Sequence, residues 1–234
     1  MNGLTHAIAA VLLISLLAFS PALAVVGAGG TISVVGDSYD FGFVPFDYRL
    51  VHIYTITNTG PGDLHISKVV PNCDCTSAHI KDTVLSPNDS TKLKILFHTR
   101  DYYGQTRRIV AIHSDDPKDS IFEVEYSANI GMFPKAFKID PKSLFFLPGP
   151  GAKEVNIFNY SEDRITFSLE LSEDSLLTIS FDSDEIKPGK SAALQVKPVE
   201  GLGLGTFYCN FTVVINATSN PGARITVPVK IVRY

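Results

Sequence analysis

The chain has 234 residues, and 45% of them are hydrophobic, so it is long enough for one or two domains with real cores. This composition excludes an intrinsically disordered chain. The formal net charge of -4 excludes the strongly basic surface that nucleic acid binding requires, and no basic cluster indicates an anionic membrane surface.

The N-terminus has the pattern of an export signal. "HAIAAVLLISLLAFSPALA" is a short apolar run that ends in Ala22-Leu23-Ala24, the small-x-small pattern of a cleavage site. We predict a signal peptide at 1–24, a flexible segment at 25–36 and a mature protein in the periplasm or outside the cell, with no transmembrane segment. The alternative is an uncleaved segment that anchors the chain to the inner membrane, because no Lys or Arg precedes the apolar run.

Apolar and polar residues alternate through most of the remaining chain. In 50–58, "LVHIYTITN", Val51 and Ile53 face one way and His52 and Tyr54 the other. The segments 91–98, 121–130 and 225–232 alternate similarly, and turn signals such as "NTGPGD", "SDDPKDS" and "KPGK" separate such segments. Period-two alternation in short, β-branched segments predicts half-buried strands and an all-β fold.

The strand pattern occurs twice. "ITNTGPGDLHISKV" is followed about one hundred residues later by "IFNYSEDRITFSLEL", and "LSPNDSTKLKILFH" by "IKPGKSAALQVKPV". The spacing matches the size of an immunoglobulin-like domain. We therefore predict two tandem immunoglobulin-like antiparallel β-sandwich domains, at 37–131 and 132–234, with "GMFPK" as a short linker between them.

The first copy resembles a known family. "YDFGFVPFDYRLVHIYTITNTGPGDLHISKVVPNCDCTS", then "LSPNDSTKLKILF" and "SDDP", is similar to a bacterial immunoglobulin-like family of unknown function that belongs with the abnormal-spindle and hydin-like domains. The chain departs from the family pattern at Asp74 and Asn88, where Gly is usual, and the second copy is more degenerate. The resemblance implies an immunoglobulin-like fold and an extracytoplasmic setting, and it carries no established activity.

Cys73 and Cys75 are the candidate site. The second copy has "SEDSLLTIS" at the corresponding place, so the fold does not require the thiols. In an extended strand, residues i and i+2 share a face about 6.6 Å apart, which suits joint ligation of Cu(I). It suits a disulfide less well, because its Cα atoms usually lie about 5.5–6 Å apart. A turn at "PNCDC" would instead permit a disulfide, either structural or redox-active.

Histidines favour the metal alternative. All five histidines beyond the signal segment lie in the first copy, and His79, four residues after Cys75, is the nearest candidate for a third ligand. Cys209 alternates with Phe207 and Phe211, which predicts a buried and inert thiol.

The chain lacks G-x-S-x-G and H-E-x-x-H, and "GLGLG" lacks the lysine and the following helix of a phosphate loop. We therefore expect no catalytic residue, no cofactor and no enzymatic activity. The predicted function is a cell-envelope binding or structural module whose partner is a protein or another envelope component, for example an extended peptide added to a sheet edge. The alternative is a thiol–disulfide or Cu(I)-binding protein that uses Cys73 and Cys75.

Overall fold

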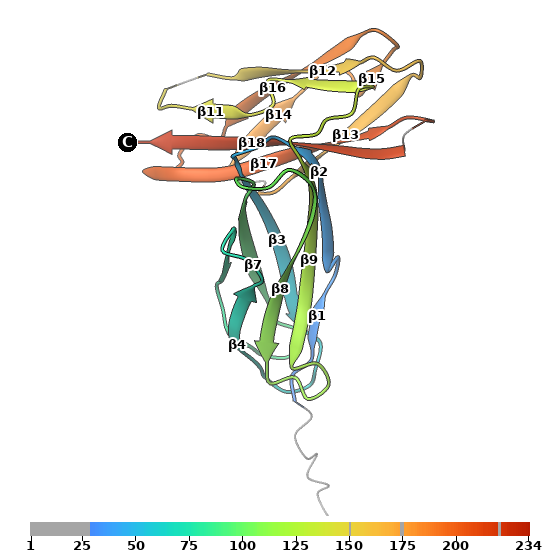
Figure 1. Ribbon diagram of the computed structural model, residues 1–234. Coiled ribbons are helices and arrows are strands. Elements are labelled where there is room, and N and C mark those ends of the chain that lie inside the picture. The colour runs from blue at the N-terminus through green and yellow to red at the C-terminus, as the bar shows by residue number, and fades with distance from the viewer. Residues whose placement is uncertain (1–28, 150, 174–175, 220) are drawn as a thin grey trace, which may run out of the picture.

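The computed structural model describes residues 29–149, 151–173, 176–219 and 221–234 (Figure 1). Within these ranges the chain forms strands joined by turns and contains no helix, and so no helix that is long and apolar enough to cross a membrane. The prediction of an all-β fold is confirmed. The predicted signal peptide at 1–24 lies outside the described residues.

Two of the three sheets have four strands each. The first has the order β1 (Ile32–Val34), β3 (Arg49–Asn58), β7 (Ser90–His98) and β5 (Thr76–Ile80). The second has the order β10 (Phe137–Asp140), β12 (Lys153–Asn159), β16 (Ser191–Pro198) and β14 (Leu177–Ser180). The segment 25–36 is not flexible throughout, because Ile32 is buried and β1 pairs with β3.

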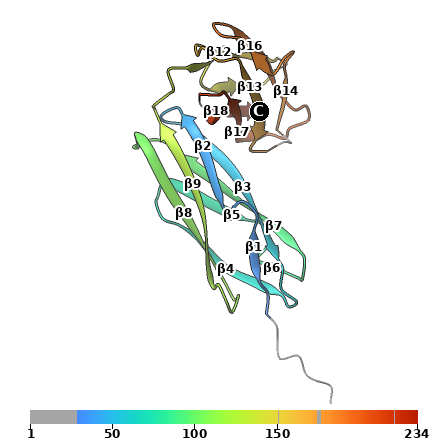
Figure 2. The same cartoon turned by 90° about the vertical axis from the view of Figure 1, so that its right-hand side faces the viewer.

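The third sheet has ten strands and runs through both halves of the molecule (Figures 1 and 2). Its C-terminal part holds β15 (Glu185–Ile186), β13 (Ile165–Leu171), β17 (Gly205–Asn216), β18 (Pro221–Arg233) and, beside β18, β11 (Leu144–Phe146). Its N-terminal part holds β2 (Ser38–Val44), β9 (Ile121–Ile130), β8 (Gly104–Ser114), β4 (Leu64–Pro71) and β6 (Val84–Leu85).

Each half has its own hydrophobic core between a four-stranded sheet and its part of the ten-stranded sheet. The N-terminal core includes Phe41, Leu93 and Phe97, and the C-terminal core includes Phe137, Leu194 and Phe211. The inward residues alternate with exposed ones along strands such as β7 and β16, as the sequence predicts. The halves are therefore sandwich-like.

A buried asparagine occupies the same place in each half. The Asn58 side-chain amide donates to the carbonyls of Gly62 and Leu85 at 2.7 and 2.8 Å. The Asn159 amide donates to the carbonyls of Asp163 and Ile186 at 2.8 and 3.0 Å. Both side chains are fully buried, and each fixes the turn that follows its strand.

The prediction of purely antiparallel sheets is wrong at three pairs: β2 with β9, β11 with β18, and β18 with β2 are parallel. In each half the chain forms one strand of the four-stranded sheet, β1 or β10, and then crosses to the ten-stranded sheet as β2 or β11. A segment that changes sheets keeps its direction, so it meets the last strand of its half in parallel.

The D-F-G motif at the start of the first copy lies where the halves join. β18 bridges to β2 through Ile225 and Phe43, so the ten-stranded sheet is continuous. Gly42 has a φ of 66°, and a Cβ there would overlap the backbone carbonyl of Arg224. Asp40 Oδ1 accepts the Gly42 N–H at 2.9 Å, which holds the bulge of β2 in place.

Polar and aromatic side chains cover this joint. The Arg224 guanidinium donates to both Glu170 carboxylate oxygens at 2.9 and 2.5 Å, and this bond holds the pKa of Glu170 below its usual value. Arg224 also lies over the Tyr39 ring, 5.1 Å from its centroid. His52 stacks on Tyr39 at 3.7 Å between centroids, and burial lowers the pKa of His52 to about 4.

Candidate functional site

Cys73 and Cys75 form a disulfide in the turn between β4 and β5. The turn brings their Cα atoms to 5.2 Å, closer than the spacing expected for an extended strand. The expectation of two thiols side by side on a strand is therefore wrong, and the alternative of a turn holds. Both residues are half-buried, and Cys75 packs against the N-terminal core.

Two hydroxyl groups adjoin the disulfide. Thr76 Oγ1 lies 3.5 Å from the Cys73 sulfur and 3.7 Å from the Cys75 sulfur, and it is hydrogen-bonded to the Tyr126 hydroxyl. Tyr126 is almost fully buried, and burial raises its pKa to about 12. The sequence offered no signal for this grouping, because Tyr126 lies on β9, fifty residues from Thr76.

His79 is not brought to the cysteine pair. β5 begins at Thr76, and Thr76, Ala78 and Ile80 lie toward the core, while His79 is exposed. His79 instead lines a 330 Å³ pocket with Lys94. Among the described residues no group of three or more His, Cys, Asp or Glu side chains is arranged to hold a metal. A two-coordinate Cu(I) site on the reduced cysteines stays a prediction.

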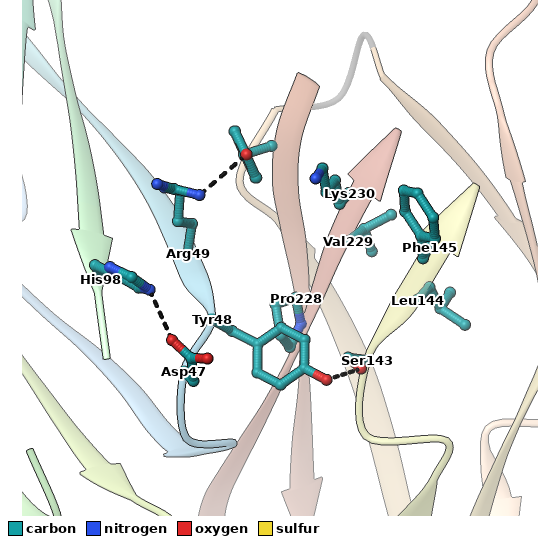
Figure 3. Close-up of a pocket in the computed structure, with 11 residues that line it drawn as sticks. Asp47, Tyr48, Arg49, His98, Ser143, Leu144, Phe145, Pro228, Val229 and Lys230 are labelled. Carbon is teal, nitrogen blue, oxygen red and sulfur yellow. Dashed lines mark hydrogen bonds and ion pairs between the residues drawn. The ribbon is translucent and has the colours of Figure 1, made fainter. Parts of the chain in front are cut away.

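A second candidate site is a pocket of about 310 Å³ between the halves (Figure 3). The N-terminal half contributes the residues that lead into β3 and the end of β7, and the C-terminal half contributes β11, β17 and β18. The lining residues are Asp47, Tyr48, Arg49, His98, Ser143, Leu144, Phe145, Tyr208, Pro228, Val229 and Lys230.

Hydrogen bonds across the pocket fix its polar rim. Tyr48 and Ser143 join their hydroxyls at 2.8 Å, so the two halves are linked at one end of the pocket (Figure 3). His98 Nε2 lies 3.1 Å from the Asp47 carboxylate. Asp47 is thus already engaged with a neighbour and makes no ion pair with Arg49 or Lys230.

Arg49 and Lys230 converge on the ring of Tyr208. The Arg49 guanidinium carbon lies 4.9 Å from the ring centroid, and Lys230 Nζ lies 5.9 Å from it and 5.4 Å from the Phe145 ring centroid. Both side chains belong to exposed residues, and neither has a carboxylate partner in the described part of the chain. Arg49 donates to the Tyr208 hydroxyl oxygen at 3.1 Å, which leaves the Tyr208 proton available to a further acceptor.

Apolar residues form the floor beside these cations. Leu144 and Val229 are buried, and Phe145 keeps 45% of its surface exposed. β11 has β18 on one side and, within the described ranges, no ladder partner on the other. The pocket therefore combines two unpaired cations with apolar surface and an unpaired strand edge, a set of groups that can bind an anionic and partly apolar ligand.

The sequence did not predict this pocket. Arg49, Tyr208 and Lys230 lie on three strands, and the nearest two are twenty-two residues apart in the sequence. Only the strand order brings them together, and that order depends on the joint between β2 and β18. The prediction that Cys209 is buried and unpaired is confirmed.

Comparison with curated proteins found no match. A protein of unknown function from Porphyromonas gingivalis W83 is 17% identical over 85% of this chain and 99% of its own, with a TM-score of 0.36. The periplasmic chaperone SfaE is 11% identical over 86% of this chain and 99% of its own, with a TM-score of 0.33. The secreted serine protease VesC from Vibrio cholerae is 14% identical over 75% of this chain and 48% of its own, with a TM-score of 0.36.

These structural likenesses are too distant to carry an argument about this chain. The match to a family model is more specific. It covers residues 32–130, from the first residue of β1 to the last residue of β9, and the family is described as "Protein of unknown function (DUF1573)". The N-terminal half of this chain is therefore a DUF1573 domain, the domain that carries the Cys73–Cys75 disulfide.

Proposed function

We propose that the chain is a non-enzymatic binding module of the cell envelope that holds an extended peptide segment at the pocket between its halves. In this proposal the halves are immunoglobulin-like sandwich domains, at about 37–131 and 132–234, of the abnormal-spindle and hydin-like type. A carboxylate of the peptide binds Arg49 and Lys230, and the adjoining residues of the peptide lie along β11.

The observation that carries this proposal is that Arg49 and Lys230 both lie at the Tyr208 ring and that neither has a carboxylate partner within the described residues. A guanidinium that donates to a neutral hydroxyl at 3.1 Å gains a stronger, charge-assisted bond when a carboxylate arrives. Lys230 supplies a second positive charge over the same ring, and the Tyr208 O–H supplies a third donor. Hydrogen bonds to charged groups contribute about 1.5–3 kcal/mol each, enough to select carboxylate over amide.

The edge of β11 supports a peptide as the rest of the ligand. An extended chain can form main-chain hydrogen bonds with an unpaired strand, and its side chains then fall alternately on each face. Phe145 points away from the C-terminal core and is half exposed beside the pocket, so it offers apolar surface to such a side chain. The absence of recognisable catalytic motifs in the sequence supports binding rather than catalysis.

The envelope location rests on the N-terminal sequence pattern and agrees with a disulfide between Cys73 and Cys75. Cleavage after Ala24 predicts that the exported protein begins at Val25. Intact mass measurement of the protein from an envelope fraction tests this. A protein that retains residues 1–24 in the inner membrane indicates the anchored alternative, and a protein found only in the cytoplasm contradicts the proposal.

The binding proposal is tested with an array of hexapeptides presented with a free C-terminal carboxylate and, in a second array, with a C-terminal amide. We expect the full mature chain to bind a subset of the carboxylates and to bind their amides at least tenfold more weakly. The double variant Arg49→Ala, Lys230→Ala is expected to lose this preference. The matched control is Lys68→Ala, Lys187→Ala, which removes the same charge from exposed positions outside the pocket.

Three outcomes contradict the proposal: no peptide binds, carboxylate and amide peptides bind equally, or both double variants weaken binding equally. The last result indicates a general effect of net charge rather than recognition at the pocket. Turnover of a substrate by the purified chain also contradicts a purely binding role.

A further inference from the structure

We propose that Cys73 and Cys75 form a thiol–disulfide redox site that exchanges two electrons with an external dithiol. This inference does not rest on the pocket between the halves, since the disulfide lies in the turn between β4 and β5 and lines none of the pockets described above. Three observations carry it: the partial exposure of the two cysteines, the hydroxyl groups beside their sulfur atoms, and the corresponding place in the other half.

The two cysteines lie in a turn, and both are half-buried rather than enclosed in the core. Asp74 between them is exposed, so an external thiol can reach the turn from solvent. A structural disulfide is commonly enclosed, whereas exchange requires a sulfur atom that an attacking thiolate can approach.

Thr76 and Tyr126 are positioned to stabilise the reduced form. Thr76 Oγ1 lies within 3.7 Å of both sulfur atoms and can donate its proton to either one as a thiolate. The Tyr126 hydroxyl can then donate to Thr76 Oγ1, so two hydroxyls in series act on the sulfur. A hydrogen bond to the charged form favours that form.

Arg108 adds a positive charge next to Tyr126. It lies opposite Tyr126 across β8 and β9, stacks 4.4 Å over the Tyr102 ring, and lowers the pKa of Tyr126 against the effect of burial. Its buried Nε has no hydrogen-bond partner, and Arg108 has no carboxylate partner among the residues that the structure describes. A positive charge that lowers the pKa of Tyr126 makes its hydroxyl a better hydrogen-bond donor to Thr76.

The C-terminal half supplies an internal control. Thr76 pairs with Phe97 at the start of β5, as Leu177 pairs with Pro198 at the start of β14.

Across the matching hairpins, Arg108 faces Tyr126 where Cys209 faces Val229. All three counterparts, Leu177, Cys209 and Val229, are apolar and buried in the C-terminal core. The fold is therefore built without the polar group, which occurs only in the half that has the cysteine pair.

Reduction of the disulfide proceeds by two thiol–disulfide exchange steps. A thiolate of the external dithiol attacks one sulfur of the Cys73–Cys75 bond, and that bond breaks with its electron pair left on the other cysteine as a thiolate. The second thiolate of the dithiol then attacks the mixed disulfide and releases the remaining cysteine. The external dithiol is oxidised to a disulfide, Cys73 and Cys75 are reduced, and the two protons of the dithiol pass to solvent or to the released thiolates.

The test uses the full mature chain in dithiothreitol. Mass-shift alkylation counts free thiols, and iodoacetamide rates across pH give the thiolate fraction of the reduced pair. We expect complete and reversible reduction without unfolding. Thr76→Val is expected to lower the thiolate fraction at pH 7 about tenfold, because it removes a hydrogen bond to a charged group. Tyr126→Phe is expected to lower it about threefold, since its hydroxyl acts through Thr76.

Ser77→Ala is the matched control, because Ser77 is an exposed hydroxyl on the same strand and should leave the thiolate fraction unchanged. If Thr76→Val fails to fold, Tyr126→Phe decides the question. The proposal is overturned if excess dithiothreitol leaves the folded wild-type disulfide intact, which indicates a structural bond. It is also overturned if the folded Tyr126→Phe variant titrates like Ser77→Ala.

Discussion

β2 and β11 occupy the same position in their halves, and the two halves use that position differently. Each strand follows a crossover from a four-stranded sheet and lies parallel to the last strand of its half. β18 meets the outer side of β2 through the pair Ile225–Phe43. Within the described residues, nothing pairs with the outer side of β11.

The difference shows that the same strand serves as a joint in one half and as an open edge in the other. Gly42 permits the close approach of β18 to β2. β11 has no glycine at its centre but Phe145, which is half exposed beside Arg49 and Lys230. An unpaired edge is a place where proteins bind extended partners or aggregate, so its surroundings decide which occurs. Here the surroundings are charged.

Gly42→Val should have the largest effect on this comparison. A side chain at a φ of 66° is strained, and its Cβ would overlap the carbonyl of Arg224. We expect a loss of more than about 3 kcal/mol in the free energy of unfolding, because strain and overlap add, and we expect the Phe43–Ile225 pairing to be lost. Urea denaturation measures the loss. Gly203→Val, at an exposed glycine with open space around it, is the control, and equal losses from both would contradict the role assigned to Gly42.

Asn58→Ala and Asn159→Ala test whether the matching asparagine hydrogen bonds contribute equally to the stability of the two halves. Each substitution leaves two buried or partly buried carbonyls without their donor, so we expect each to cost about 2–3 kcal/mol. Thermal melting of each variant provides the measurement. A large loss of stability from only one of the two variants would show that the buried asparagine is needed in one half and dispensable in the other.

The joint should also respond to pH through His52. Its folded pKa of about 4 lies below the ordinary value of 6.5, so between these values the unfolded chain binds a proton that the folded chain does not. The free energy of unfolding therefore has its full contribution from neutral His52 above pH 6.5. It falls as the pH is lowered from 6.5 to 4, by at most about 1.4 kcal/mol per pH unit. Denaturant melts from pH 7 to 4 on wild type and His52→Phe measure this. The exposed His79→Gln should retain the wild-type slope, and an unchanged slope in His52→Phe would contradict the prediction.

The ion pair between Lys94 and Glu173 should have the smallest effect. Its nitrogen and oxygen lie 2.6 Å apart across the two halves, with the side chains 40% and 27% exposed. Partly exposed pairs of this kind contribute roughly 0.2–1 kcal/mol and are weakened by salt. A double-mutant cycle with Lys94→Ala and Glu173→Ala at low and high salt gives the coupling. A coupling above about 2 kcal/mol would mean that charge, rather than the shared sheet, holds the halves together.

The strands were predictable from the sequence, because apolar and polar residues alternate along each one and turn-forming residues such as Gly, Pro, Asn and Asp lie between them. The similarity of the two halves was predictable because these patterns recur in the same order. Asn58 and Asn159 could be aligned by eye since their neighbours repeat. The joint was not predictable, because the pairing of Phe43 with Ile225 has no local signature.

At the cysteine pair, the expectation of an extended strand was wrong. His79 was the nearest histidine in the sequence to Cys75, but β5 begins only at Thr76 and leaves His79 exposed. A turn of a few residues changed both the spacing of the sulfurs and the face of the histidine. The partners that matter chemically, Thr76 and Tyr126, meet through packing between sheets, which no spacing along the chain reveals.

The late position of β18 in the chain has a consequence for the order of folding during synthesis. β2 is made early, but Phe43 gains its partner in β18 only when Ile225 has emerged. Until then the N-terminal half, if it folds first, leaves Phe43 without its partner and without the C-terminal core against which it packs. During synthesis, β2 is therefore for a time an unpaired strand edge that can pair with another chain. A chaperone that binds β2 during that interval would raise the yield of chains in which β18 pairs with β2.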